Sequence, residues 1–340
     1  GHSADDNYKN VVLHVVLEDD APDLNDIPVL ELHQRVPRLL LDKYEALMQQ
    51  QSFVPCVATI TQVSSLTWMG WKERLAAERL TRKSKGILDV FERRGNHWEE
   101  TFWQLLARNF GMKVNGDAFE NVAQTVPVKL LAKHKASIHQ LEALLLGQAN
   151  LLPKEPADEY SKLLTREYHF LKAKYGLTPT VIPIHFLRMR PPNFPTIRLA
   201  QLAALVQQSE HLFSKILEAQ TIGQVKQWLS VTANDYWHYH YRLGEPSAYR
   251  PKTLGADMID NIVINTIIPT LFAYGAYHQK EDLKEKAIAW LQQTTSEKNH
   301  IIKGFKDVSV ASLSAFDSQA LIELKNSYCN YRRCLDCAVG

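Results

Sequence analysis

The chain has 340 residues, of which 45% are hydrophobic and 22% are charged, and its formal net charge is +2 at pH 7. This composition is typical of a folded globular protein and excludes an intrinsically disordered one. A charge so close to neutral does not by itself indicate binding to nucleic acid or to an anionic membrane, so any electrostatic argument has to be local. The length favours two packed units over one large core.

The first six residues carry neither a basic nor an apolar run, so no secretory leader is visible there. The longest apolar stretch, residues 258–274, contains an aspartate, two asparagines and a proline, which is too polar for a membrane span. Four cysteines in a chain of this length are typical of a reducing interior. We therefore expect a cytoplasmic protein that does not enter a membrane.

Residues 11–17 form an apolar, β-branched run, and a second short run follows the turn-forming residues 18–26 at residues 28–32. This order predicts a β-hairpin with a long loop. Because an isolated hairpin is marginally stable in water, we expect it to pair with further strands or to lie on helices. The chain thus begins within a sheet, either because strands precede Gly1 or because the sheet is small.

From Pro37 onward apolar side chains recur at helical spacing. Asn96 is a suitable N-cap for a helix that ends at Gly111. The expected helices cover residues 66–94, 97–110, 128–146, 157–175, 197–219, 256–277, 280–293 and 314–328. Stretches rich in turn residues or proline, at residues 147–156 and 176–196, interrupt them.

The predicted fold class is α+β and predominantly α-helical, with a small N-terminal β-hairpin or sheet followed by a multi-helix body. Residues 1–65 form a β-containing segment, and residues 66–150 form a helical segment packed with it. Residues 151–340 form a helical domain that ends in a cysteine cluster.

Three of the four cysteines lie in the terminal run, with C-x4-C-x2-C spacing, and are a candidate metal site. Tetrahedral zinc or an iron–sulfur cluster needs four ligands, and ligand counting adds the one upstream cysteine. Arg332 and Arg333 lie between the ligands and can stabilise thiolates. The alternative is a set of reduced thiols packed under the last helix. The candidate ligands are Cys56, Cys329, Cys334 and Cys337.

A stiff, proline-rich segment at residues 186–198 carries three arginines into the start of a helix. Guanidinium groups near a helix N-terminus suit phosphate or carboxylate, and Phe186 and Phe194 could stack on bases. The alternative is an interdomain strap whose arginines pair with local acids. If this segment is a phosphate site, we expect lysines of residues 129–135 to border it. The candidate phosphate-binding residues are Arg188, Arg190, Arg198, Lys133 and Lys135.

Two further helical stretches carry polar side chains whose roles the sequence leaves open. The basic residues between Lys72 and Lys85 are typical of a solvated helix face. In the helix expected at residues 256–277, Asp257, Asn261 and Asn265 share one stripe among aliphatic residues. Such a stripe either cross-links neighbouring helices, which we favour, or lines a pocket.

Nucleases that use two metal ions place an acidic residue on a strand to hold Mg²⁺ and a lysine two positions later. Glu31 and His33 occupy these two positions here, which makes Glu31 the candidate catalytic residue and a candidate Mg²⁺ ligand. His33 departs from the pattern. No P-loop, dinucleotide-binding, serine-hydrolase or zinc-protease motif occurs in the sequence.

Several long strings resemble a bacterial family catalogued as domain of unknown function 2851. They are NHWEETFW at residues 96–103, LAKHK at 131–135, RMRPPNFPTIR at 188–198, DNIVINT at 260–266, SAFDSQ at 314–319 and the terminal cysteine run. The resemblance covers essentially the whole chain and implies further strands before Gly1, with Glu-Leu-Lys where this chain has Glu31, Leu32 and His33. It therefore implies a truncated, nuclease-like N-terminal sheet.

These observations lead to the hypothesis of a bacterial intracellular protein that binds or processes nucleic acid. The alternative is a non-catalytic scaffold or interaction protein with a structural metal site.

Overall fold

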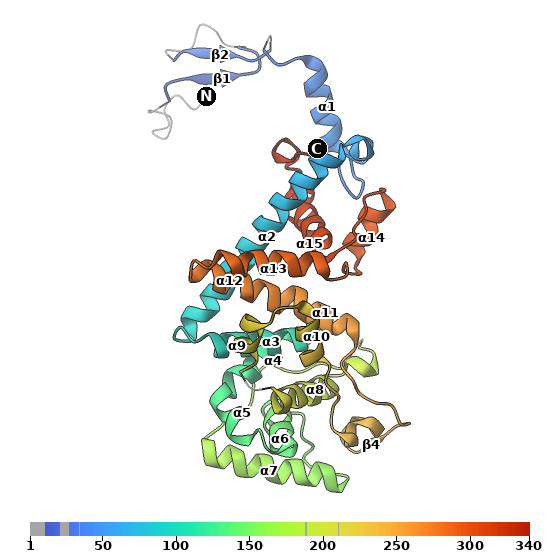
Figure 1. Ribbon diagram of the computed structural model, residues 1–340. Helices are drawn as coiled ribbons and strands as arrows, with labels where there is room; N and C mark the ends of the chain where they lie inside the picture. The colour runs from blue at the N-terminus through green and yellow to red at the C-terminus, as the bar shows by residue number, and fades with distance from the viewer. Residues whose placement is uncertain (1–10, 21–26, 34, 188, 210) are drawn as a thin grey trace. The chain divides into compact units, whose positions relative to one another are not determined.

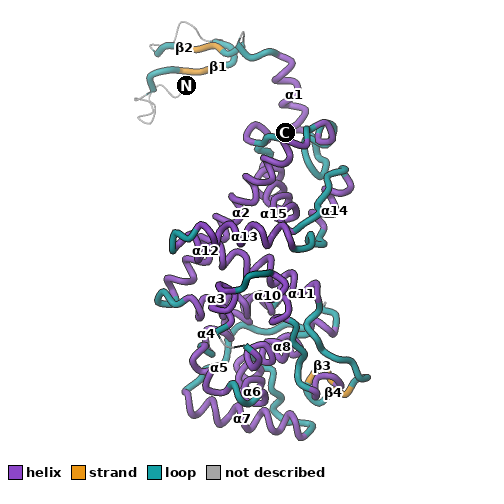
Figure 2. Tube along the Cα trace, in the orientation of Figure 1, coloured by secondary structure: helices purple, strands orange, loops and turns teal. Residues whose placement is uncertain are grey.

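The computed structural model describes residues 11–20, 27–33, 35–187, 189–209 and 211–340. The fold class is as the sequence predicts: the chain is predominantly α-helical, and its sheets are two small pairs of strands (Figure 2). The contacts divide the chain into two units. The first comprises Gly1–Trp71, Asp307–Val310 and Leu324–Gly340, and the second comprises Lys72–Lys306 and Ala311–Glu323.

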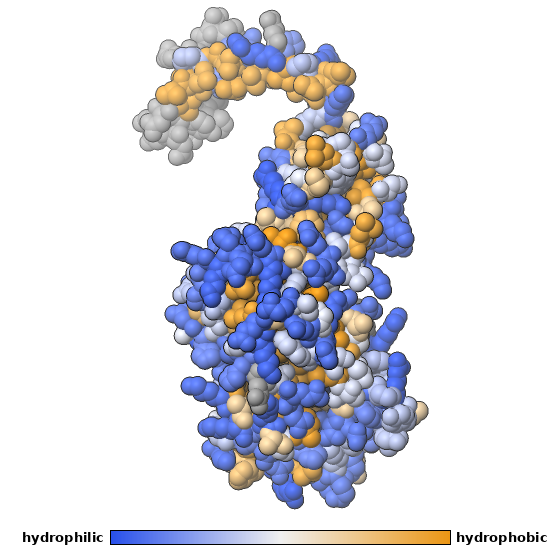
Figure 3. All heavy atoms as spheres, viewed as in Figure 1, coloured by the Kyte–Doolittle hydropathy of each residue, from blue (hydrophilic) through white to orange (hydrophobic). Residues whose placement is uncertain are grey.

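The first unit begins with two short strands, β1 (His14–Val16) and β2 (Val29–Glu31). They pair in parallel, with His14 opposite Val29 and Val16 opposite Glu31, so the prediction of a hairpin is wrong. A hairpin requires antiparallel strands. Val12, Leu13, Val15 and Leu17 are exposed, and Figure 3 shows hydrophobic side chains gathered over β1 and β2.

Helix α1 (Arg38–Gln49) follows, and residues 50–64 then form turns with a single 3₁₀ turn at Ile60–Gln62. Helix α2 (Ser65–Arg93) begins in this unit and continues into the second one. The C-terminal part of the unit is a π turn at Leu324–Tyr328 and two 3₁₀ turns at Cys329–Tyr331 and Cys334–Asp336. The core of this unit is small and includes Val54, Ile60, Trp71, Tyr328 and Val339.

The second unit is a body of packed helices (Figure 1). Its first part consists of α3 (Trp98–Phe110), α4 (Met112–Thr125), α5 (Val128–His134), α6 (Ile138–Gln148) and α7 (Glu159–Tyr175). Its second part consists of α8 (Pro195–Gln208), α9 (Leu212–Glu218), α10 (Ile222–Leu229), β3 (His240–Arg242), β4 (Glu245–Pro246), α11 (Ala256–Ile262), α12 (Ile268–Tyr277), α13 (Glu281–Gln293), α14 (His300–Asp307) and α15 (Ala315–Glu323).

Helix boundaries differ from the expected ones where a side chain caps the backbone. The helix expected at residues 128–146 is divided into α5 and α6, because Ser137 accepts a hydrogen bond from the Gln140 N–H and begins a new helix. The N-cap of α3 is His97 rather than Asn96, and its side chain accepts a hydrogen bond from the Glu100 N–H. Gly111 ends α3 as expected, but α4 follows it at once.

Helix α8 lies at the centre of the second unit, where it contacts α3 and α6 and buries every residue from Pro195 to Leu205. A continuous helix, Ala256–Tyr277, joins α11 to α12 through a π turn at Val263–Ile267. By length and composition alone this helix could cross a membrane, in contrast to the prediction from its polar residues. However, 67% of its most apolar window is buried inside the protein, as in a core helix.

Candidate anion-binding site

A pocket of about 410 Å³ lies in the second unit between the start of α8 and the start of α11. The loop before α8 is fixed by Asn115 of α4, whose side chain accepts the His185 N–H and donates to the His185 carbonyl, at 2.8 Å in each case. Proline at the first position of α8 then suits the helix start. The polar lining of the pocket includes Asn193, Arg198, Gln201, Arg250, Asp257 and Asn261.

Arg198 carries a buried positive charge at this pocket, since its side chain is on the fully packed part of α8 and the residue is only 6% exposed. Its Nη1 donates to Oε1 of Gln201 at 2.9 Å and its Nη2 donates to Oδ1 of Asn193 at 2.6 Å. Nε has no hydrogen-bond partner, and no carboxylate in the described part of the chain forms an ion pair with the guanidinium. Burial lowers the pKa of Arg198 to about 10. The two amides therefore orient the charge without neutralising it.

Lys252 is a second buried cation, and it is not among the residues that line this pocket. Its Nζ donates to the carbonyls of Arg250 and His238, at 3.0 and 3.4 Å, and lies 3.9 Å from the centre of the Tyr241 ring. Gln201 donates from Nε2 to the backbone carbonyl of Lys252, while its Oε1 accepts from Arg198. Burying an unpaired charge is costly, so the buried guanidinium of Arg198 indicates a site that receives an anion.

Two further features make the mouth of the pocket positive. Arg250 is exposed and lines it. Gly255, which also lines it, is the N-cap of the continuous helix that runs to Tyr277, so the free N–H groups of the first turn lie next to the pocket. Phosphate and carboxylate are the groups that such donors and charges bind.

A second pocket, of about 260 Å³, adjoins the first because Asp257 and Asn261 line both. Two of the acids around it form ion pairs: Lys226 pairs with Asp260 at 2.7 Å, and Lys298 pairs with Asp257 at 3.7 Å. The polar stripe on this helix is therefore partly exposed and lines pockets at Asp257 and Asn261. Asn265 forms the cross-link between neighbouring segments that the sequence favoured. Its Oδ1 accepts a hydrogen bond from Lys83 at 2.9 Å, and its Nδ2 donates one to Glu297 at 3.4 Å.

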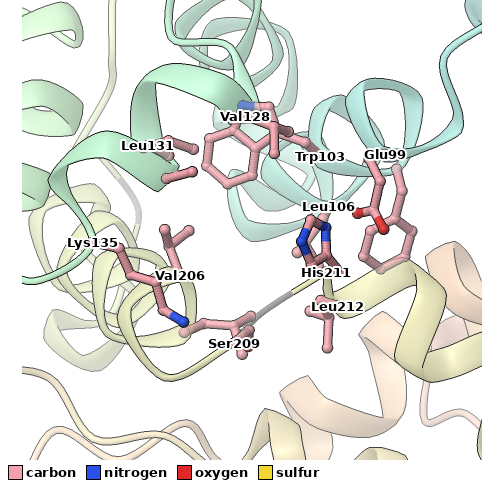
Figure 4. Close-up of a pocket in the computed structure, with 13 residues that line it drawn as sticks. Glu99, Trp103, Leu106, Val128, Leu131, Lys135, Val206, Ser209, His211 and Leu212 are labelled. Carbon is pink, nitrogen blue, oxygen red and sulfur yellow. The ribbon is translucent and has the colours of Figure 1, made fainter.

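Of the other candidate phosphate-binding residues that the structure describes, none lines the Arg198 pocket. Arg190 is exposed and precedes the 3₁₀ turn Pro191–Asn193, and Arg188 lies outside the described residues. Lys133 lies 5.8 Å from the centre of the Tyr175 ring. Lys135 lines a different, mainly apolar pocket of about 140 Å³, where its Nζ extends toward Ser209 (Figure 4). Trp103 and Leu106 of α3 and Val206 of α8 form much of the wall of this apolar pocket.

The rings expected to stack on bases are engaged inside the protein. Phe186 and Phe194 meet edge to face at 5.2 Å, and the guanidinium of Arg242 lies over both rings, at 4.5 and 5.2 Å. The histidine and aromatic run packs in the same way, since His240 stacks on Tyr236 at 3.9 Å. These side chains therefore support the wall of the site rather than offer a free stacking surface.

Part of the basic stretch of α2 forms ion pairs with α15, while Arg74 and Lys85 lie on an exposed face. Lys72 pairs with Asp317 at 2.9 Å. Arg79 and Arg82 both pair with the buried Glu323, at 3.2 and 2.5 Å. Lys83 donates to Gln319 at 3.0 Å, and burial, together with the nearby charge of Arg79, lowers the pKa of Lys83 to about 7. This stretch is thus a cross-link between helices.

Glu31, the candidate catalytic residue, is exposed at the end of β2. One of its carboxylate oxygens accepts the Asp19 N–H at 2.8 Å, and His33 pairs with Glu18 at 2.8 Å. The carboxylate therefore caps a turn of the backbone. Its role in binding Mg²⁺ stays a prediction.

The fold and the pocket define a predominantly α-helical protein with a small sheet and a candidate site for an anion. A family model described as a protein of unknown function (DUF2851) matches residues 1–300, and the chain belongs to this family. The terminal cysteine run lies beyond the matched residues. Comparisons with curated proteins and with solved structures gave no match.

Proposed function

We propose that this protein binds nucleic acid through a backbone phosphate held in the pocket at Arg198. The observation that carries the proposal is a buried guanidinium that two amide oxygens orient and that no carboxylate in the described chain neutralises. A phosphate in the pocket would balance the charge of Arg198. The helix N-terminus at Gly255 and the side chain of Arg250 add donors at the mouth.

The adjoining pockets favour a polymer over a small anion. A phosphate at Arg198 would leave the neighbouring nucleotide beside Asp257 and Asn261, which the two pockets share. Amide and carboxylate side chains of this kind form hydrogen bonds with base edges and with sugar hydroxyls. The net charge of +2 requires that binding depend on a local positive charge, which the buried guanidinium of Arg198 provides.

The proposal concerns binding. A Mg²⁺-dependent processing step at Glu31 is a separate proposal, which cleavage assays of the wild type and of Glu31→Gln in Mg²⁺ would test. Cleavage that survives this substitution would place the chemistry elsewhere.

Replacing Arg198 by methionine should weaken the binding of a single-stranded oligonucleotide by about 10- to 100-fold, since one charged hydrogen-bond donor contributes roughly 1.5–3 kcal/mol. The logarithm of the affinity should also fall less steeply with the logarithm of the salt concentration, by about one unit for each phosphate that the protein no longer neutralises. Methionine keeps most of the side-chain volume. Fluorescence anisotropy over a salt series measures both quantities.

Two further variants distinguish a loss of binding from a loss of folding. Arg250→Ala changes an exposed residue of the same pocket and should flatten the salt dependence in the same direction. Arg166→Ala is the matched control, because Arg166 is exposed on α7 and pairs only loosely with Glu167, at 3.9 Å. Equal affinity in all three variants would refute the site. Binding of pyrophosphate that depends on Arg198, without binding of the oligonucleotide, would replace nucleic acid by a small phosphorylated ligand. Binding of neither would leave the scaffold alternative.

A further inference from the structure

Two segments that are far apart in the sequence meet in the first unit. Lys325 donates from Nζ to the Phe53 carbonyl at 2.6 Å and lies 4.7 Å from the centre of the Phe53 ring. Arg332 donates from Nη2 to the Gln50 carbonyl at 3.2 Å. The Trp71 ring meets the Tyr328 ring edge to face at 5.3 Å. The C-terminal run is thus held against residues 50–71, the segment that contains Cys56.

The four cysteines belong to the two segments that meet at this junction. Cys56 and Cys334 are buried, and Cys329 and Cys337 are half-buried. The contacts of Lys325, Arg332 and Tyr328 with residues 50–71 surround Cys329 in the sequence, so they hold the run of three cysteines against the segment of Cys56.

The surroundings of these cysteines provide donors and positive charge for thiolates. The Val339 N–H donates to Sγ of Cys337 at 3.5 Å. The cations of Lys325 and Arg332, which bind the carbonyls of Phe53 and Gln50, lie at the same junction. N–H donors and cations around sulfur are the outer-shell partners that metal-bound thiolates use.

Gly340 closes the chain tightly over Cys334. A Cβ at position 340 would lie 2.9 Å from the Cys334 carbonyl oxygen and 3.1 Å from its Cα, so only glycine fits this approach. The last residues therefore wrap back over the second cysteine of the run and bring the Cys337 sulfur under the backbone N–H groups of residues 339 and 340.

We propose that the four cysteines are the ligands of one metal centre that ties the C-terminal run to residues 50–71. The ligands are Cys56, Cys329, Cys334 and Cys337. Four thiolates suit zinc, or iron in a mononuclear or iron–sulfur centre. In the described residues no three His, Cys, Asp or Glu side chains stand in the arrangement of a preformed metal site, so metal binding would require the four sulfurs to rearrange around the ion. Each thiol would lose one proton to solvent as it binds.

The fold of the first unit gives such a centre a structural purpose. Residues 50–64 and 329–340 contain only turns and one-turn helices, yet they bury Val54, Cys56, Ile60 and Cys334. A small core built on irregular segments usually needs a disulfide or a metal for stability. The binding free energy of a structural metal adds directly to the stability of the segments that it joins.

The test uses the full chain purified under anaerobic, reducing conditions. Elemental analysis should find about one zinc, or iron with visible absorbance, per chain. In the wild type all four thiols should resist alkylation, and chelation should expose all four. Cys56→Ser should weaken metal binding by more than about tenfold, the lower limit seen when outer-shell partners are removed. Asn330→Ser changes an exposed residue within the run and should leave the metal content unchanged.

Several outcomes would overturn the proposal. If the native protein contains neither metal and added Zn²⁺ or Fe²⁺ does not protect its thiols, the cysteines are packed thiols without a centre. A disulfide between any two of them, found by mass spectrometry without reduction, would assign the junction to redox chemistry. Unchanged metal binding in Cys56→Ser would exclude the ligand that joins the two segments. The alkylation measurement on the wild type keeps the test valid if a cysteine variant fails to fold.

Discussion

Substituting alanine for Gly147 should destabilise the second unit by roughly 3 kcal/mol, at the upper end of the usual cost of overpacking. Gly147 lies near the end of α6, where an added Cβ would overlap Cγ and Cδ2 of the Tyr168 ring on α7. The ring cannot easily turn away, because Tyr168 is buried and its hydroxyl accepts a hydrogen bond from Gln148 at 3.1 Å. Helices α6 and α7 would have to separate. Urea unfolding followed by circular dichroism measures the loss.

Gly86→Ala is the matched control for this substitution. Gly86 is an exposed glycine within α2, and an added Cβ there meets no atom within 4 Å. The helix preference of alanine should then stabilise the protein by about 0.5–1 kcal/mol. In a background that carries Tyr168→Ala, the cost of Gly147→Ala should vanish, since the overlapping ring is gone. A cost that persists without the ring would show that another contact confines Gly147.

Helical periodicity in the sequence is sufficient to predict most helices. The long helices α2, α7 and α13, and the continuous helix at residues 256–277, lie within two residues of their expected bounds. Short helices escape prediction, because α10 and α14 contain too few turns for a period to stand out. The break at Ser137 also escapes it, although serine before a helix is a recognisable cap signal.

Strand direction cannot be read from the sequence. Two apolar runs joined by a turn-rich loop fit a hairpin and a parallel pair equally well, and only the path of the connecting residues distinguishes them. The sequence also does not indicate which distant segments belong to the same unit. The last 17 residues belong to the first unit, a contact between chain ends that no local pattern indicates.

The residues at the candidate site differ in how readily the sequence identifies them. Arg198 stands out in the sequence because arginines follow prolines at the start of a helix, and this local signal identifies a pocket residue. Lys252 and Gln201 do not stand out, because their roles depend on burial and on the absence of a nearby carboxylate in the described chain. Tertiary contacts also decide that the basic residues of α2 pair with Glu323 rather than face solvent.

The stability of the second unit should fall as the pH rises from about 4.5 to about 7, because Glu142 is completely buried within α6. Burial raises the pKa of Glu142 to about 7, against an ordinary value of 4.5, although hydrogen bonds from Tyr160 and Trp237 act in the opposite direction. One carboxyl oxygen accepts both bonds, at 2.7 and 2.9 Å, and the other has no partner among the described residues. The neutral acid is therefore the form that the fold prefers.

The sign and the size of this effect follow from proton linkage. Between pH 4.5 and 7 the unfolded chain has released the proton of Glu142 while the folded chain retains it, so raising the pH favours unfolding. The whole difference amounts to roughly 3 kcal/mol, at about 1.4 kcal/mol for each pKa unit, and it is fully expressed above pH 7. Below pH 4.5 both states hold the proton and this group no longer affects the equilibrium.

Glu142→Gln should remove this pH dependence, since the amide resembles the neutral acid and its oxygen can still accept from Tyr160 and Trp237. The variant should match the wild type near pH 4.5 and exceed its stability by roughly 3 kcal/mol at pH 8. Urea midpoints from pH 4.5 to 8 measure the difference between the two proteins, which cancels the contributions of all other groups. Glu155→Gln, the same change at an exposed carboxylate, should follow the wild type at every pH. A difference between the wild type and Glu142→Gln that stays constant over this range would mean that Glu142 is ionised in the folded protein and that an additional partner neutralises it.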